Sequence, residues 1–93
     1  MSAFNEVVHI LSKITSKKEM EKFLDEILTE NERRDISLRW ELMKKIHEGI
    51  PQRAIASELG ISLCRITRGS KILKSKDSLI GKILNDKVYS SSK

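Results

Sequence analysis

The sequence contains a single cysteine, a single proline and no apolar run longer than a few residues. A lone cysteine, Cys64, cannot form a disulfide within its own chain, and a reduced thiol fits a protein of the cytoplasm. The short apolar runs exclude a membrane-spanning helix. The first residues also lack the basic start and apolar stretch of a signal peptide. We therefore expect a cytoplasmic protein with no membrane partner.

Residue patterns typical of catalysis and metal binding are missing as well. His9 and His47 stand apart, and no cluster of cysteines or carboxylates has the spacing of a metal site. The chain has no glycine-rich phosphate loop and no recognisable pair of nucleophile and base. We expect neither an enzyme nor a metal-binding protein.

Strand signals are equally scarce, whereas helix signals recur. The sequence has no Asn-Gly or Asp-Gly hairpin turn and no sustained alternation of apolar and polar residues. Apolar residues at spacings of three and four predict a first helix over residues 4–14. Ser16 with Glu19, and Thr29 with Glu32, have the spacing of capping boxes that open a second and a third helix.

The third helix is predicted to be the longest and to end near Gly49, which favours a left-handed stop. It carries the apolar residues Ile36, Leu38, Trp40, Leu42, Met43, Ile46 and Ile50. A helix that is apolar over so much of its surface is usually central to the core. We therefore expect Trp40 to be a core side chain rather than part of a site.

Three shorter helices account for the rest. Pro51 suits a first helical turn, Ser62 is a candidate N-cap for a helix to about Ser75, and Ser78 caps a last one. The predicted organisation is one helical domain over residues 1–93: a dimerisation core and central helix in 1–50, a helix-turn-helix unit in 51–75, a C-terminal helix in 76–88 and a frayed tail in 89–93. The apolar faces of the first two helices are generous for one small core, which favours an intertwined dimer.

Positive charge is concentrated in the second half of the chain. Residues 1–50 carry nine Lys/Arg and ten Asp/Glu, a net charge of −1, whereas residues 51–93 carry nine and three, a net charge of +6. A polyanionic partner such as nucleic acid explains this asymmetry, and so does a merely solvated surface. Charge alone does not decide between them.

Residues 51–74 have the pattern of a helix-turn-helix unit. Gly60 can adopt the positive φ that ends the first helix and turns the chain, and Ala56 is small where the helices approach. The apolar positions expected to pin the two helices across each other are Ile55, Leu59, Ile61 and Ile66. An ordinary corner between two helices is the alternative, but it does not require exposed positions so rich in basic residues.

In such a unit the second helix lies in the major groove, with the residues near its start facing the bases. Arg65 can donate two hydrogen bonds to guanine, and Leu63 can contact a thymine methyl group. Cys64 lies in the same turn, although a small buried side chain is the alternative. The predicted DNA-contacting residues are Gln52, Arg53, Ser62, Leu63, Cys64, Arg65, Thr67, Lys71 and Lys74, the two lysines through phosphate.

A longer series of residues goes beyond what helix packing requires. It runs Leu28-Thr29-x-x-Glu32-Arg33, Arg39, Gly49, Gln52-Arg53, Glu58-Leu59-Gly60, Ile66-Thr67-Arg68-Gly69-Ser70 and Leu73-Lys74. In this order, over residues from about 20 to about 84, the chain resembles the Trp repressor family. The resemblance implies an all-α, six-helix intertwined homodimer that binds L-tryptophan as corepressor and then binds operator DNA of tryptophan biosynthesis or uptake genes.

The resemblance also implies a ligand site. Carried over by position, Arg39 and Arg68 would enclose the indole ring, with Arg68 also pairing with the ligand carboxylate. Gly69 would leave room for the ring, and the backbone carbonyls of Leu28 and Thr29 from a second copy would receive the ammonium group. Without the resemblance, Arg39 is better explained as a solvated charge, and a contact with phosphate alone is the alternative for Arg68.

The chain departs from the family pattern near this site. Ile72, in the ligand site, stands where a serine often helps to hold the ammonium group, Arg65 where a threonine is common, and Lys71 where an asparagine is common. These departures keep open a second function, a helix-turn-helix regulator that responds to a different small molecule or to none. A basic module that binds an acidic protein is a third.

Overall fold

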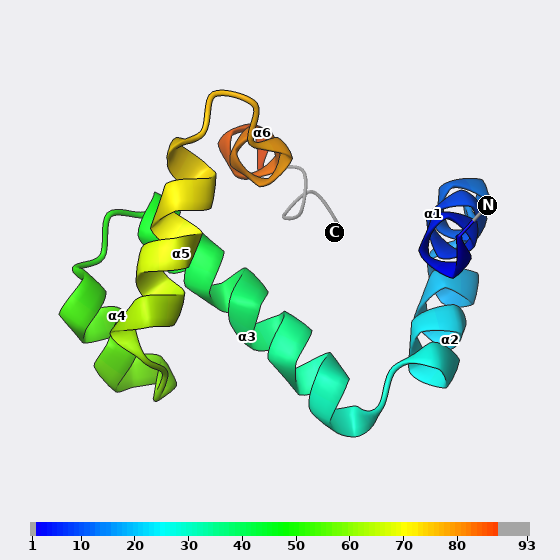
Figure 1. Ribbon diagram of the computed structural model, residues 1–93, viewed down its shortest axis with the longest axis horizontal. Helices are drawn as coiled ribbons and strands as arrows, with labels where there is room; N and C mark the ends of the chain where they lie inside the picture. The colour runs from blue at the N-terminus through cyan, green and yellow to red at the C-terminus, as the bar shows by residue number, and fades with distance from the viewer. Residues whose placement is uncertain (1, 88–93) are drawn as a thin grey trace. The chain divides into compact units, whose positions relative to one another are not determined.

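The computed structural model describes residues 2–87, which form helices and no strand. The six helices are α1 (Ala3–Lys13), α2 (Lys17–Ile27), α3 (Glu30–His47), α4 (Gln52–Leu59), α5 (Leu63–Lys74) and α6 (Leu79–Asp86) (Figure 1). The predicted all-helical class and the predicted number of helices are confirmed. The last helix is shorter than the predicted segment 76–88, because Lys87 adopts a left-handed conformation with φ 53° and ends it. Residue 88 and the predicted tail lie outside the described residues.

Side-chain caps explain where the helices begin. The hydroxyls of Ser2, Ser16, Ser62 and Ser78 each accept a hydrogen bond from the backbone N–H three residues on, at 3.1, 3.3, 3.3 and 2.9 Å. Thr29 and Glu32 form a complete capping box. The Glu32 N–H donates to Thr29 Oγ1 at 3.1 Å, and the Thr29 N–H donates to Glu32 Oε1 at 2.8 Å. Each cap satisfies a backbone donor that the first helical turn leaves unpaired.

Two glycines mark helix ends, as predicted. Gly49 and Gly60 adopt φ values of 86° and 66°, a conformation that side chains with a Cβ atom rarely take. The Gly60 N–H donates to the Ala56 carbonyl at 2.9 Å and closes α4. Pro51 precedes the first turn of α4 rather than lying within it. None of the helices over residues 2–87 is long and apolar enough to cross a membrane.

The chain divides into two compact units, Met1–Arg34 and Asp35–Lys93. In the second unit, α4 and α5 lie beside each other and α6 follows α5 (Figure 1). Its core contains Leu42, Ile55 and Ile66, and the residues packed around them are Ile46, Ile50, Ala56, Leu59 and Ile61. Ile55 and Ile66 are fully buried, and burying such a side chain stabilises the fold by about 1.5–3 kcal/mol.

The central helix is less buried than its apolar pattern predicts. Only Leu42 and Met43 of α3 are buried, and Ile36 is 52% exposed. The buried pair lies in the half of α3 that packs in the core of the second unit, whereas Ile36 lies nearer the start of the helix and lines a pocket. Within the described residues, the expectation of a helix central to the core therefore holds for Leu42 and Met43 but not for Ile36.

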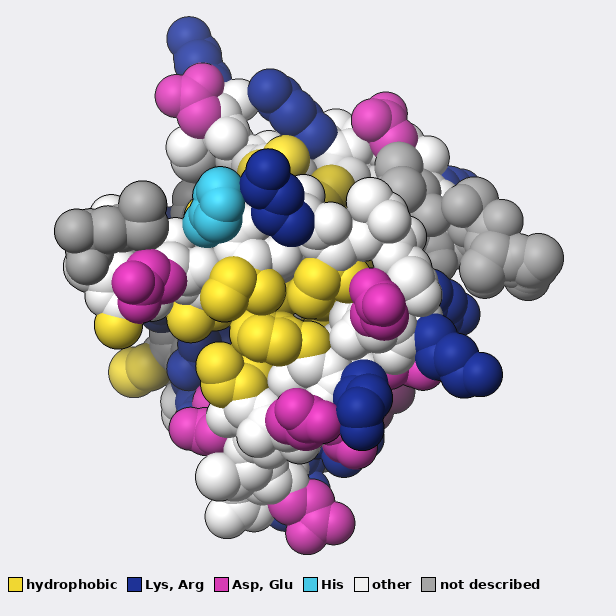
Figure 2. Space-filling view, turned by 90° about the vertical axis from the view of Figure 1, so that its right-hand side faces the viewer, with side chains coloured by type: hydrophobic (Ala, Val, Ile, Leu, Met, Phe, Trp, Pro, Cys, Tyr) yellow, Lys and Arg dark blue, Asp and Glu magenta, His cyan; other side chains and the backbone are white. Residues whose placement is uncertain are grey.

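The first unit does not bury any residue of α1 or α2. Phe4 is 75% exposed, Val8 49% and Ile27 48%. Figure 2 shows one face of the molecule, on which hydrophobic side chains gather into a patch. Two amphipathic helices thus expose apolar faces that this unit alone does not cover.

Candidate functional site

The second unit contains a mainly apolar pocket of about 350 Å³. Its walls come from α3, α5 and α6, and the lining residues are Ile36, Arg39, Trp40, Leu42, Met43, Arg65, Arg68, Gly69, Ile72 and Ile80. The polar side chains among them are three arginines and one tryptophan, all of which are hydrogen-bond donors. Such a pocket suits a flat apolar group that carries a negative charge.

The structure brings together four of the residues predicted to bind the ligand. Arg39 comes from α3, whereas Arg68, Gly69 and Ile72 come from α5, and all four line the same pocket. The Arg39 side chain is 68% exposed. Arg65, which was expected to face DNA, also lines this pocket. What these side chains bind is not shown by their position and stays a prediction.

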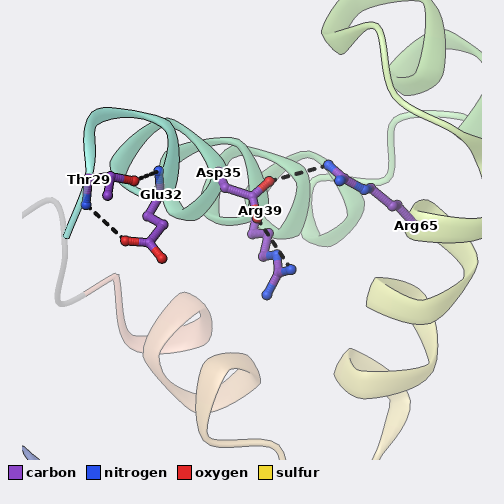
Figure 3. Close-up of polar contacts among 5 residues, drawn as sticks. All are labelled: Thr29, Glu32, Asp35, Arg39 and Arg65. Atoms are coloured by element: carbon purple, nitrogen blue, oxygen red, sulfur yellow. Dashed lines mark hydrogen bonds and ion pairs between the residues drawn. The ribbon is translucent and has the colours of Figure 1, made fainter.

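Asp35 connects two of the pocket arginines, and sequence reasoning did not single it out. Its Oδ2 atom lies 3.4 Å from Arg39 Nη2, one turn further along α3. Its Oδ1 atom lies 3.4 Å from Arg65 Nη1 on α5 (Figure 3). The spacing of four residues between Asp35 and Arg39 is a signal that was available in the sequence. The contact with Arg65 spans 30 residues and has no local signal.

Gly69 has a packing role that its sequence context did not reveal. A Cβ atom on this buried glycine would lie 3.2 Å from Ile46 Cδ1 and 3.4 Å from Leu42 Cδ2. The missing side chain therefore faces the apolar side of α3, and its absence lets α5 approach α3 closely. Space for a ligand ring beside Gly69 is a separate prediction, and the position of Gly69 on the pocket wall is compatible with it.

Trp40 departs from expectation. It was predicted to be a core side chain with no part in a site, but it is only half-buried and lines the pocket. The indole therefore forms part of the pocket wall and is not among the buried core residues of the second unit. An indole wall adds a flat apolar surface against which an aromatic ligand can stack.

The residues predicted to contact DNA lie on α4, α5 and the turn between them. All nine are exposed: Gln52, Arg53, Ser62, Leu63, Cys64, Arg65, Thr67, Lys71 and Lys74. The exposed position of Cys64 rules out the alternative of a buried thiol. Two hydroxyls already have helical partners. Ser62 caps α5, and Thr67 Oγ1 donates to the Leu63 carbonyl at 2.9 Å.

Leu28 and Thr29, the remaining predicted ligand contacts, belong to the other unit. Leu28 ends α2, and Thr29 immediately precedes α3. The Thr29 carbonyl accepts the Arg33 N–H at 2.9 Å, so one of its two lone pairs is already used. The second lone pair can accept a further donor.

Comparison with known proteins gives a consistent result. The family model described as Trp repressor protein matches residues 2–87. A Trp operon repressor homolog from Chlamydia trachomatis serovar L2 is 35% identical over 80 residues, covering 81% of this chain and 85% of that protein. A homolog of the same name from Xylella fastidiosa is 36% identical and covers 87% of this chain and 92% of that protein. One from Vibrio campbellii is 30% identical and covers 78% of this chain and 74% of that protein. No solved structure matches the chain.

Proposed function

This chain belongs to the Trp repressor family, and on that premise we propose that it is a homodimeric, cytoplasmic repressor that binds operator DNA when L-tryptophan occupies its pocket. The family is one of DNA-binding regulators rather than enzymes. Membership therefore supports a role in transcription regulation. The ligand, the dimer and the operator are the parts that we propose.

The pocket supports an aromatic amino acid as the ligand. Its volume of about 350 Å³ falls within the range of small-molecule sites. Guanidinium planes stack well on an indole ring, and a guanidinium can donate two parallel hydrogen bonds to a carboxylate. We assign the stacking to Arg39 and Arg68, and the carboxylate to Arg68. Gly69 and Ile72 form the adjoining wall.

A second copy of the chain would complete this site. The exposed apolar residues of α1 and α2, with Phe4 at 75% exposure, need a partner surface to leave water. An intertwined dimer covers them and brings residues of the second copy towards the pocket. Leu28 and Thr29 from that copy would then offer backbone carbonyls to the ligand's ammonium group.

The pair of helices α4 and α5 supports DNA binding. We assign Arg65 and Leu63, in the exposed first turn of α5, to base edges in the major groove. Lys71 and Lys74 further along α5 would contact phosphates. The remaining proposed contacts are Gln52, Arg53, Ser62, Cys64 and Thr67. A ligand between α3 and α5 would set the angle at which α5 enters the groove.

One observation carries this proposal: Arg39 of α3 and Arg68 of α5, which are 29 positions apart, line one pocket, and α5 also presents Arg65. Binding to a candidate operator fragment, followed by fluorescence anisotropy with and without L-tryptophan, tests it. We expect tighter binding with tryptophan, steeply reduced by salt. Arg68→Ala should abolish the response to tryptophan, whereas the control Lys82→Ala, on α6, should retain it. An unchanged affinity with tryptophan would reject the corepressor.

Ile72 favours one alternative. An isoleucine at this wall cannot accept a hydrogen bond from an ammonium group, which suits a regulator that responds to a different small molecule or to none. Such a protein would bind operator DNA with the same affinity whether or not tryptophan is present. The same anisotropy experiment therefore distinguishes the two functions.

A further inference from the structure

The pocket has many groups for a ligand's carboxylate and few for its ammonium. Among the described residues that line it, the polar side chains are Arg39, Arg65, Arg68 and Trp40, and each can only donate hydrogen bonds. An ammonium group that enters beside three guanidinium groups meets like charge. A carboxylate close by would remove this repulsion and would accept the ammonium N–H groups. Asp35 is such a carboxylate, at 3.4 Å from both Arg39 and Arg65.

We propose that Asp35 receives the α-ammonium group of the ligand and makes the pocket selective for aromatic α-amino acids over aromatic acids that lack the amino group. This inference rests on the proposed function. In this inference the Asp35 side chain on α3 accepts hydrogen bonds from the ammonium group. The apolar side chain of Ile72 on α5 cannot do so. The carbonyls of a second copy can share the ammonium, because that group has three N–H donors.

Asp35 is able to accept another donor. Its two contacts are long, at 3.4 Å, compared with about 2.7–2.9 Å for a well-formed bond between a guanidinium and a carboxylate. The carboxylate offers about four lone-pair sites and is 39% exposed, so it is neither saturated nor covered. Half-exposed ion pairs of this kind are weak and exchange easily.

An ammonium group on Asp35 also has a consequence for Arg65. The new donor competes with Arg65 Nη1 for the same carboxylate and weakens this long contact, so that the guanidinium leaves α3 more readily. Arg65 lies in the first turn of α5, on the exposed side proposed to face DNA. Ligand recognition and the availability of a DNA-facing arginine are thereby linked through one carboxylate.

Calorimetric titration of the full chain with L-tryptophan and with indole-3-propionate, which has no amino group, tests the inference. We expect the unmodified protein to bind tryptophan more tightly. Asp35→Asn, which keeps the shape but removes the charge, should weaken tryptophan binding by roughly ten- to hundredfold. It should leave the affinity for indole-3-propionate within about twofold of the unmodified value. Asp35→Glu, which keeps a carboxylate, should retain most of the preference.

Glu58→Gln is the matched control, because it neutralises another carboxylate that pairs with α3, 3.0 Å from Lys45, away from the pocket. It should leave both affinities unchanged. Equal losses for both ligands on Asp35→Asn, or no loss for either, would overturn the role of Asp35 and leave the proposed function standing. If the folded, unmodified protein binds neither ligand, the proposed tryptophan site itself is rejected. Circular dichroism of each variant establishes that it is folded.

Discussion

Gly69 on α5 faces Ile46 on α3 so closely that a Cβ atom on the glycine would lie 3.2 Å from the isoleucine Cδ1 atom. Leu42 Cδ2 is the next neighbour, at 3.4 Å. A single β-carbon can be accommodated if the end of the Ile46 side chain shifts slightly. A larger, branched side chain has no such freedom, because Leu42 and Ile46 both belong to the core around Ile55 and Ile66.

Gly69→Val should therefore lower the free energy of unfolding by about 1–3 kcal/mol, the usual cost of overpacking. Valine has a higher helix propensity than glycine, so local preference opposes this effect. Urea denaturation followed by circular dichroism measures the difference. Ser57→Val, at an exposed position of α4, is the control and should change stability by no more than about 0.5 kcal/mol. A Gly69→Val protein as stable as the control would show that α5 can move away from α3 at little cost.

The capping box at the start of α3 leads to a second prediction. Thr29→Ala removes the hydroxyl that accepts the Glu32 N–H at 3.1 Å and leaves that donor without its cap. We expect a loss of about 0.5–2 kcal/mol in the free energy of unfolding, measured by urea denaturation. Thr29→Ser keeps the hydroxyl and should stay within about 0.5 kcal/mol of the unmodified protein. Equal stability of the two variants would show that the cap contributes nothing.

Such caps explain why most helix boundaries could be predicted from the sequence. A cap joins residues that are three apart, so both partners are visible in a short window of sequence. The starts of α2, α3, α5 and α6 were found in this way. The Ser2 cap has the same spacing to Asn5 and was overlooked, although the signal was present. The left-handed glycines at 49 and 60 are equally local signals.

The candidate site was only partly predictable, because it depends on how helices approach one another. The resemblance to a known family indicated Arg39 and Arg68, and the structure places both at one pocket. The pairing of Asp35 with Arg65 arises only when α3 and α5 meet, and no periodicity encodes it. The exposure of Ile36 and the partial burial of Trp40 depend on how the other helices pack on α3. An apolar pattern indicates that a helix face is covered in the folded protein, but it does not show whether the same chain or a second copy covers it.

The ion pair between α3 and α4 gives a prediction about pH. Lys45 Nζ lies 3.0 Å from Glu58 Oε2, and this hydrogen bond raises the pKa of Lys45 above its ordinary value. Partial burial of the amine opposes the rise, whereas the charges of Glu58, Glu41 and Glu48 add to it. A raised pKa in the folded state means that the stabilisation is complete below the unfolded pKa of about 10.4 and is lost as the pH rises through the folded pKa.

Glu58→Gln removes this contribution. The unmodified protein should be more stable than the variant at pH 8, and the difference should shrink as the pH is raised above about 10.4. Thermal denaturation of both proteins across this pH range measures the difference directly. Glu6→Gln, which neutralises an exposed carboxylate on α1, is the control and should show no comparable convergence. A stability difference that is constant from pH 8 to pH 12 would contradict the assigned pairing.

The contact between Asp35 and Arg65 predicts how the protein binds DNA in the absence of ligand. Asp35→Asn removes the partner that holds Arg65 at 3.4 Å, so the guanidinium is free for DNA without tryptophan. We expect the affinity for an operator fragment without ligand to rise by roughly two- to fivefold, because a partly exposed ion pair such as that of Asp35 and Arg65 is weak. The factor by which tryptophan increases affinity should fall, because the variant has lost both the acceptor and the restraint. Asp86→Asn, on α6, makes the same change in net charge without involving Arg65. Fluorescence anisotropy at fixed salt measures both affinities. A similar rise in affinity for Asp86→Asn would attribute the effect to net charge. A rise confined to Asp35→Asn would show that this carboxylate restrains the DNA-facing arginine.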